Sequence, residues 1–194
     1  MRGFFIGTIM VAVLGIAGSA AATPIIYTDT GTGSGMIDGQ SFTNAQFVIR
    51  ATGDTSDRQA FSGGWSIDNL TAQITIDALG TFSFITPTRF FVNNSNDTVG
   101  FSRASITGAD LYNGPTNPAF GSWQMLTSIG PISGSAFLLQ WTFSPVITSG
   151  GVLVFNNGAT DGTFTATVVP EPATLLLLGT GLVGGVRRLR KRTR

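Results

Sequence analysis

The stretch Leu70-Thr71-Ala72-Gln73-Ile74-Thr75-Ile76-Asp77 decides the fold class. Apolar side chains alternate with polar ones through all eight positions. Successive side chains of a β-strand point to opposite faces of its sheet, so this alternation predicts a strand with one buried and one wet face. A helix would need apolar residues every three or four positions instead.

Similar apolar runs recur along the chain, at residues 42–51, 81–85, 89–92, 99–102, 137–143, 152–155 and 164–168. Clusters rich in Gly, Asn and Asp separate them, as expected for turns. Many short strands with frequent turns are typical of two packed antiparallel sheets. We therefore predict an all-β fold, an antiparallel β-sandwich of jelly-roll kind, with the last two runs paired as a hairpin.

Composition agrees with one all-β domain at residues 23–169, because the chain has 26 Gly and only 11% charged residues. Six of the eleven basic residues lie in the last eight positions. Residues 23–169 hold four Arg against nine Asp, a net charge of −5. An acidic domain does not neutralise phosphates, so we expect no nucleic-acid partner.

The chain has neither Cys nor His. Disulfides, Ser-His-Asp and Cys-His nucleophiles and ordinary zinc sites are therefore excluded. The one Glu, Glu171, lies near the C-terminus, and no Asp pair has a signature of carboxylate catalysis. We expect the protein not to be an enzyme.

The N-terminal residues have the pattern of a secretory signal peptide. Arg2 precedes an apolar run at residues 4–17, and small residues at 18–22 suit signal peptidase, with cleavage expected after Ala22. We predict a signal helix within residues 1–22. The alternative is a permanent anchor, for which the run is short compared with the roughly 30 Å hydrocarbon core.

The C-terminal residues 170–194 have three parts. Pro170-Glu171-Pro172 disfavours a helix and exposes backbone to a protease, and an apolar run at 173–186 follows. A basic cluster then comes: Arg187, Arg188, Arg190, Lys191 and Arg192. Under the positive-inside rule this cluster stays cytoplasmic, so the apolar run is a predicted transmembrane helix and residues 23–169 lie outside the inner membrane.

This arrangement resembles the PEP-CTERM sorting signal of Gram-negative bacteria. The resemblance implies that an exosortase cuts near the Pro-Glu-Pro motif, so that the inner membrane holds the chain only transiently. It also implies a setting of exopolysaccharide, at the cell surface or outside the cell. The alternative is a single-pass anchor that is never cleaved.

Trp65, Trp123 and Tyr112 lie among Gly, Ser and Pro residues, where an aromatic face could stack on a sugar ring. Packing in the core is the alternative for all three. Trp141 alternates with Phe137, Leu139 and Phe143, and this pattern places it in the core.

Four side chains are candidate calcium ligands: Asp54, Asp57, Asn93 and Asp97. Their spacing does not match an EF-hand loop, and ordinary turns favour the same residues. The sequence thus leaves open whether a calcium cofactor is bound.

Three hypotheses about function follow. The first is a non-enzymatic surface or matrix protein, exported and processed through its tail and associated with exopolysaccharide. The second is a carbohydrate-binding module, and the third is a secreted glycosidase-like hydrolase.

Overall fold

The computed structural model describes residues 23–105 and 108–169, which form thirteen strands and two short 3-10 helices. The strands are β1 (Pro24–Ile37), β2 (Gln40–Asp54), β3 (Gln59–Phe61), β4 (Gly64–Asp68), β5 (Thr71–Ile76), β6 (Gly80–Ser83), β7 (Thr88–Asn93), β8 (Thr98–Arg103), β9 (Asp110–Thr116), β10 (Ile129–Leu138), β11 (Val146–Thr148), β12 (Gly151–Phe155) and β13 (Gly158–Val168). The helices are η1 (Thr55–Asp57) and η2 (Pro118–Gly121).

The alternating stretch that predicted the fold class is confirmed as β5. Ala72, Ile74 and Ile76 are buried, and the Thr and Gln side chains between them are exposed. Leu70 lies just before the strand, and 67% of it is exposed. The all-β, antiparallel class is therefore confirmed.

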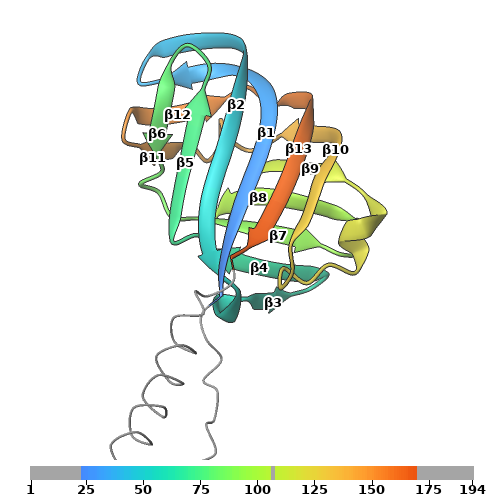
Figure 1. Cartoon of the computed structure of the whole chain (residues 1–194). Coiled ribbons are helices and arrows are strands. Elements are labelled where there is room, and N and C mark those ends of the chain that lie inside the picture. Colours follow the sequence, from blue (N-terminus) through green and yellow to red (C-terminus); the bar gives the residue numbers. More distant parts are fainter. Residues whose placement is uncertain (1–22, 106–107, 170–194) are drawn as a thin grey trace, which may run out of the picture.

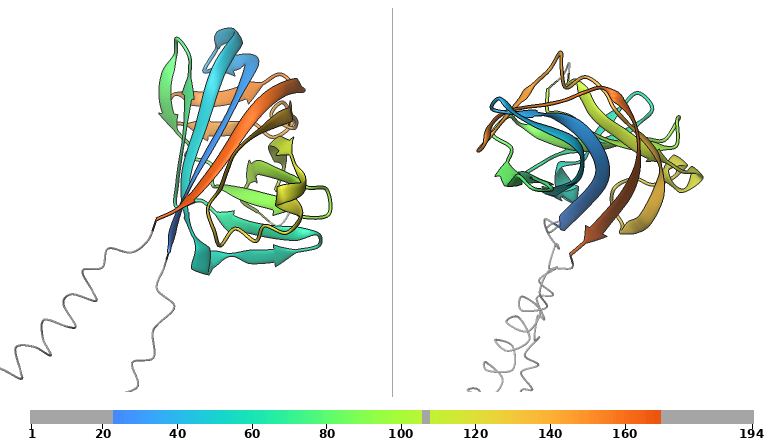
Figure 2. Two further views of the ribbon diagram at one scale, coloured as in Figure 1. Left: turned by 45° about the vertical axis from the view of Figure 1, so that its right-hand side comes forward. Right: turned by 90° about the horizontal axis from the view of Figure 1, so that it is seen from above.

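The strands belong to one continuous sheet rather than to the two separate sheets expected of a jelly roll. Their order is β3-β4-β7-β8-β9-β10-β13-β1-β2-β5-β6, and every recorded pairing is antiparallel. The sheet curls strongly, so that its halves face each other around a shared interior (Figures 1 and 2). This geometry is sandwich-like without a break between sheets.

Long strands make the single sheet possible. Strand β1 pairs with β13 along its first half and with β12 over its last three residues, while β2 runs along its other side. A register shift between Gly33 and Gly35 interrupts the β1–β2 ladder where the strand bends, as β-bulges do. The short apolar runs of the sequence did not reveal strands of this length.

The predicted hairpin between the last two runs is wrong. Strand β12 pairs with β1 and β11, whereas β13 pairs with β1 and β10. Both strands use β1, but at opposite ends of it. A bridge from Phe84 to Thr148 then connects the β11–β12 pair to the chain that follows β6. The strands at this end of the domain thus form a closed ring.

Aromatic rings are the largest side chains of the described interior, and aliphatic side chains pack among them. Tyr27 stacks on Phe90 with centroids 4.7 Å apart, and Trp141 contacts Phe155 at 4.9 Å. Trp141 is completely buried, which confirms its predicted place in the core. The buried core residues of the described chain lie between residues 25 and 166, within the predicted domain of residues 23–169.

In the described part of the chain, no helix is long and apolar enough to span a membrane. The signal helix predicted within residues 1–22 and the transmembrane helix predicted within 170–194 both lie outside the described residues.

Candidate functional site

The two ends of the folded domain lie side by side. The backbone N–H of Val169 donates to the carbonyl oxygen of Pro24 at 2.8 Å, and Val168 pairs with Ile25 at the end of the β1–β13 ladder. The Val168 N–H also donates to Ser128 Oγ at 2.9 Å. Figure 1 shows the start of β1 and the end of β13 together at one pole. Hydrogen bonding therefore extends to the residue before Pro170.

Two of the three predicted sugar-stacking rings are buried. Tyr112 is fully enclosed and donates its hydroxyl to the Thr30 carbonyl oxygen at 2.8 Å. Trp123 is 5% exposed, and its indole N–H donates to the Thr127 carbonyl oxygen at 2.9 Å. Neither ring is free to stack on a sugar in this conformation, because both complete the core.

Trp65, on β4, is half-buried, and a cation covers its ring. The Arg58 guanidinium carbon lies 3.8 Å from the ring centroid, and Nη1 of the same residue donates to the carbonyl oxygen and to Oε1 of Gln124. This arrangement is a cation–π contact held in place by two hydrogen bonds. Sugar binding by Trp65 stays a prediction, and a ligand on this face would have to displace Arg58.

The four candidate calcium ligands have separate local roles. Asp54 caps η1 by accepting from the backbone N–H and hydroxyl of Ser56, and these bonds lower the pKa of its carboxyl group. Asn93 Oδ1 accepts from the Asn96 N–H, and Asp97 has a left-handed backbone with φ of 51°. Asp57 is exposed in η1.

No group of three or more His, Cys, Asp or Glu side chains is arranged to hold a metal ion in the described part of the chain. Calcium binding at these positions stays a prediction.

Asp29 is a carboxylic acid inside the core. It is fully buried on β1, and neither of its oxygens has a hydrogen-bond partner. Burial raises the pKa of Asp29 well above its ordinary value, and the nearby Thr30 backbone N–H opposes this only in part. The Tyr27 hydroxyl is also buried without a partner. The interior therefore holds polar groups that its packing does not satisfy.

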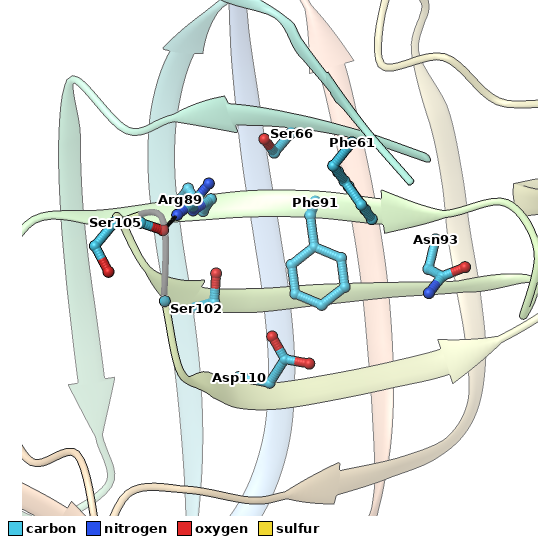
Figure 3. A pocket seen from close by; sticks show the side chains of 9 residues that line it. Phe61, Ser66, Arg89, Phe91, Asn93, Ser102, Ser105 and Asp110 are labelled. Carbon is cyan, nitrogen blue, oxygen red and sulfur yellow. Dashed lines mark hydrogen bonds between the residues drawn. The ribbon is translucent and has the colours of Figure 1, made fainter. Parts of the chain in front are cut away.

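A hollow of about 250 Å³ lies on the face of β4, β7, β8 and β9 that points away from the core. Its lining includes Phe61, Ser66, Arg89, Phe91, Asn93, Ser102 and Asp110 (Figure 3). Strand register brings these residues together: Ser66 pairs with Phe91, Arg89 with Ser102, and Ser102 with Asp110. The hollow therefore combines aromatic, hydroxyl and charged groups from four strands and from the end of β3.

Gly100 leaves room for the Phe91 side chain on the floor of this hollow. A Cβ atom at Gly100 would meet Phe91 Cζ at 2.3 Å and Asn113 Oδ1 at 2.6 Å. The Phe91 ring thus occupies the space above Gly100 on the neighbouring strand. In Figure 3 the ring lies over β8, between Ser102 and Asn93.

Sequence analysis missed this hollow. Alternation in residues 98–103 marks Ser102 as outward-facing, but nothing local places it beside Arg89 or Asp110. A second hollow, of about 650 Å³, lies near the β1–β2 turn, and its lining includes Met36, Phe42, Val152 and Val154. Its volume is larger than that of the first hollow, and more of its lining is apolar.

These features define an all-β fold whose last strand leads directly into a C-terminal segment. That segment matches the PEP-CTERM protein-sorting motif over residues 168–191, which confirms the resemblance found in the sequence. The motif marks the chain as an exosortase-targeted protein, exported through the membrane toward the cell surface. No curated protein and no solved structure matches the chain.

Proposed function

We propose that the chain is a non-enzymatic protein of the bacterial cell surface or extracellular matrix, associated with exopolysaccharide. Signal peptidase removes residues 1–22, and exosortase cuts near Pro170-Glu171-Pro172 in a Gram-negative inner membrane. The product is the β domain of residues 23–169. The observation that supports this proposal is the sorting motif, which begins at the end of the last strand of an all-β fold.

The residue types that the chain and its hollow offer support a non-enzymatic role. The chain has no His or Cys, and the lining of the 250 Å³ hollow contains one carboxylate, Asp110. Glycoside hydrolysis ordinarily needs two carboxyl groups on either side of the scissile bond. A matrix or binding role therefore fits the hollow better than hydrolysis does.

Processing is tested by mass spectrometry of the exported protein from its host. We expect peptides beginning at Thr23 and none that extend past the Pro-Glu-Pro motif. Glu171→Gln should shift the protein to the membrane fraction, whereas Asp77→Asn, an exposed acid-to-amide change on the domain, should not. Recovery of the intact basic tail on exported protein would contradict the proposal.

Association with the polysaccharide is tested separately, by co-sedimentation of segment 23–169 with the exopolysaccharide of the host, with and without calcium. We expect saturable co-sedimentation. A protein that stays in the supernatant under both conditions would remove exopolysaccharide from the proposal and leave export and processing standing.

A further inference from the structure

We propose that the hollow on β4, β7, β8 and β9 binds one neutral sugar unit with several free hydroxyl groups. This inference rests on the proposed association with exopolysaccharide, and it assigns the contact to residues other than Trp65, Trp123 and Tyr112. The argument has four parts: unpartnered hydroxyls, an aromatic wall, the distribution of charge, and size.

Two hydroxyl groups in the hollow lack partners in the protein. Ser66 and Ser102 are each 4% exposed, and both line the hollow. Among the described residues neither side chain makes a hydrogen bond, and neither hydroxyl oxygen is among the fully enclosed atoms without a partner, so both open onto the hollow and are free to bind a ligand. In Figure 3 Ser102 lies beside the Phe91 ring, and Ser66 lies on β4, across β7 from the ring. A ligand that both donates and accepts hydrogen bonds, as a sugar hydroxyl does, would satisfy them.

Asp110 adds a strong acceptor at the edge of the same floor. Its Oδ2 accepts from Asn113 Nδ2 at 3.2 Å, which fixes the carboxylate, and no protein group in the described chain donates to Oδ1. A carboxylate that accepts from a ligand hydroxyl makes a charge-assisted bond, about twice as strong as a neutral one. The fixed Asp110 is therefore suited to orient a sugar.

Phe61 supplies an apolar wall. It ends the edge strand β3, is 41% exposed, and meets Phe91 edge-on at 6.2 Å with an interplanar angle of 82°. The contact with Phe91 fixes one ring against the other while leaving part of Phe61 open to solvent. An exposed aromatic surface beside polar groups fits the mixed apolar and hydroxylated faces of a pyranose.

The charges favour a neutral ligand over an acidic one. The Arg89 guanidinium is already occupied: Nε lies 3.9 Å from Asp68 Oδ1 and donates to the Arg103 carbonyl oxygen, and Nη2 donates to the Ser105 carbonyl oxygen. Asp110 has no cationic partner in the described part of the chain. An anionic sugar would meet this carboxylate within a segment of net charge −5, and the one cation in the described lining, Arg89, already contacts Asp68 and two carbonyl oxygens.

The size of the hollow suits a single unit. Sites for drug-sized ligands measure about 300–1,000 Å³. A hollow of about 250 Å³ is slightly smaller than this range, so it suits one sugar of a longer chain. For so small a contact we expect weak binding, with a Kd of about 1–10 mM for a free monosaccharide.

The test is NMR titration of segment 23–169, which contains every core residue of the described chain, with D-glucose, D-galactose, D-mannose and D-glucuronate in turn. We expect at least one neutral hexose to shift the amide signals of Ser66, Ser102 and Asp110 saturably. Glucuronate should bind more weakly than glucose. No saturable shift with any of the three hexoses, or stronger binding of glucuronate, would overturn the proposal.

Two variants locate the site. Phe61→Ala and Asp110→Asn should each weaken hexose binding about tenfold or more. The first removes the apolar wall, and the second removes the charge-assisted acceptor. Phe143→Ala, on an 84% exposed ring, and Asp77→Asn are the matched controls and should bind as the unmodified segment does. If a hollow variant unfolds, Ser102→Ala replaces it with the same expectation. Undiminished binding by a folded hollow variant would place the site elsewhere.

The titration also separates this inference from the function on which it rests. Co-sedimentation with the exopolysaccharide that survives Phe61→Ala and Asp110→Asn would reject the hollow and keep the proposed association. Loss of co-sedimentation in these variants alone would support both.

Discussion

The backbone N–H of Val169 donates to the carbonyl oxygen of Pro24, so the residue before Pro170-Glu171-Pro172 is tied to the first residue of the sheet. Strand β1 is central in the sheet, between β13 and β2, and it also pairs with β12. The sheet therefore cannot be completed until residues 158–168 are available to pair. Completion of the sheet thus depends on the strand that leads directly into Pro170-Glu171-Pro172.

The first prediction concerns the spacing between domain and motif. A short Gly-Ser segment inserted between Val169 and Pro170 should speed the conversion of precursor to processed protein, because the processing enzyme would no longer have to approach the folded sheet. Pulse-chase labelling measures the rate. The same insertion between Asn157 and Gly158 is the control. An unchanged or slower conversion would show that the folded domain does not restrict access.

The second prediction concerns Asp29. Because burial raises its pKa, the folded state binds a proton that the unfolded state releases as the pH rises above the ordinary Asp range. Below the ordinary Asp range the ionisation of Asp29 does not affect stability. Above it, Asp29 destabilises the folded state increasingly as the pH rises toward its folded-state pKa. For Asp29 alone, we expect the domain to unfold at a higher temperature near pH 4 than near pH 7. Asp54 acts in the opposite direction, because its pKa is lowered in the folded state.

Asp29→Asn isolates this contribution. The variant should be more stable than the unmodified domain at pH 7, by at least about 1 kcal/mol, since each unit of raised pKa corresponds to about 1.4 kcal/mol. It should also show a smaller dependence of Tm on pH. Asp77→Asn, on an exposed residue, should leave the dependence unchanged. Parallel pH profiles for Asp29→Asn and the unmodified domain would contradict the account.

The third prediction concerns close packing against β1. A Cβ atom at Gly33 would lie 2.7 Å from Phe155 Cδ1 and 2.8 Å from Leu138 Cδ1, both in the core. Gly33→Ala should therefore lower the free energy of unfolding by about 1–3 kcal/mol through overpacking. Urea unfolding measures the loss.

Gly158→Ala is the matched control for that change, because a Cβ atom there meets nothing within 4 Å. It should alter the free energy of unfolding by less than about 0.5 kcal/mol. Equal effects of the two substitutions would show that the core side chains around position 33 rearrange to accommodate the added methyl group.

The fourth prediction concerns the cation over Trp65. Arg58→Ala removes both the ring contact and the hydrogen bonds to Gln124, so it should destabilise the domain by about 1 kcal/mol and shift tryptophan emission to the red. Arg58→Lys keeps the charge but not the planar group, and it should have an intermediate effect. Arg50→Ala, on an exposed residue of β2, is the control. An unchanged emission spectrum in Arg58→Ala would contradict a structural role for the pair.

The fold was predictable as far as its signals are local. Alternation at residues 70–77 identified β5, and alternation around Trp141 placed this residue in the core. The hairpin of β12 with β13 failed because adjacency in sequence did not show that β1 is long enough to pair with both. For Tyr112 and Trp123 the sequence left both sugar binding and core packing open, and the fold encloses both rings.

The sequence by itself determined the all-β class and the sorting motif, because alternation, hydropathy and charge order are written within continuous stretches of chain. Only the tertiary structure decided that Ser66, Ser102 and Asp110 share one hollow and that Val169 meets Pro24. The physical reason is register: which residue faces which across two strands is set by packing of the whole interior, and a shift of one residue would turn each of these side chains to the opposite face.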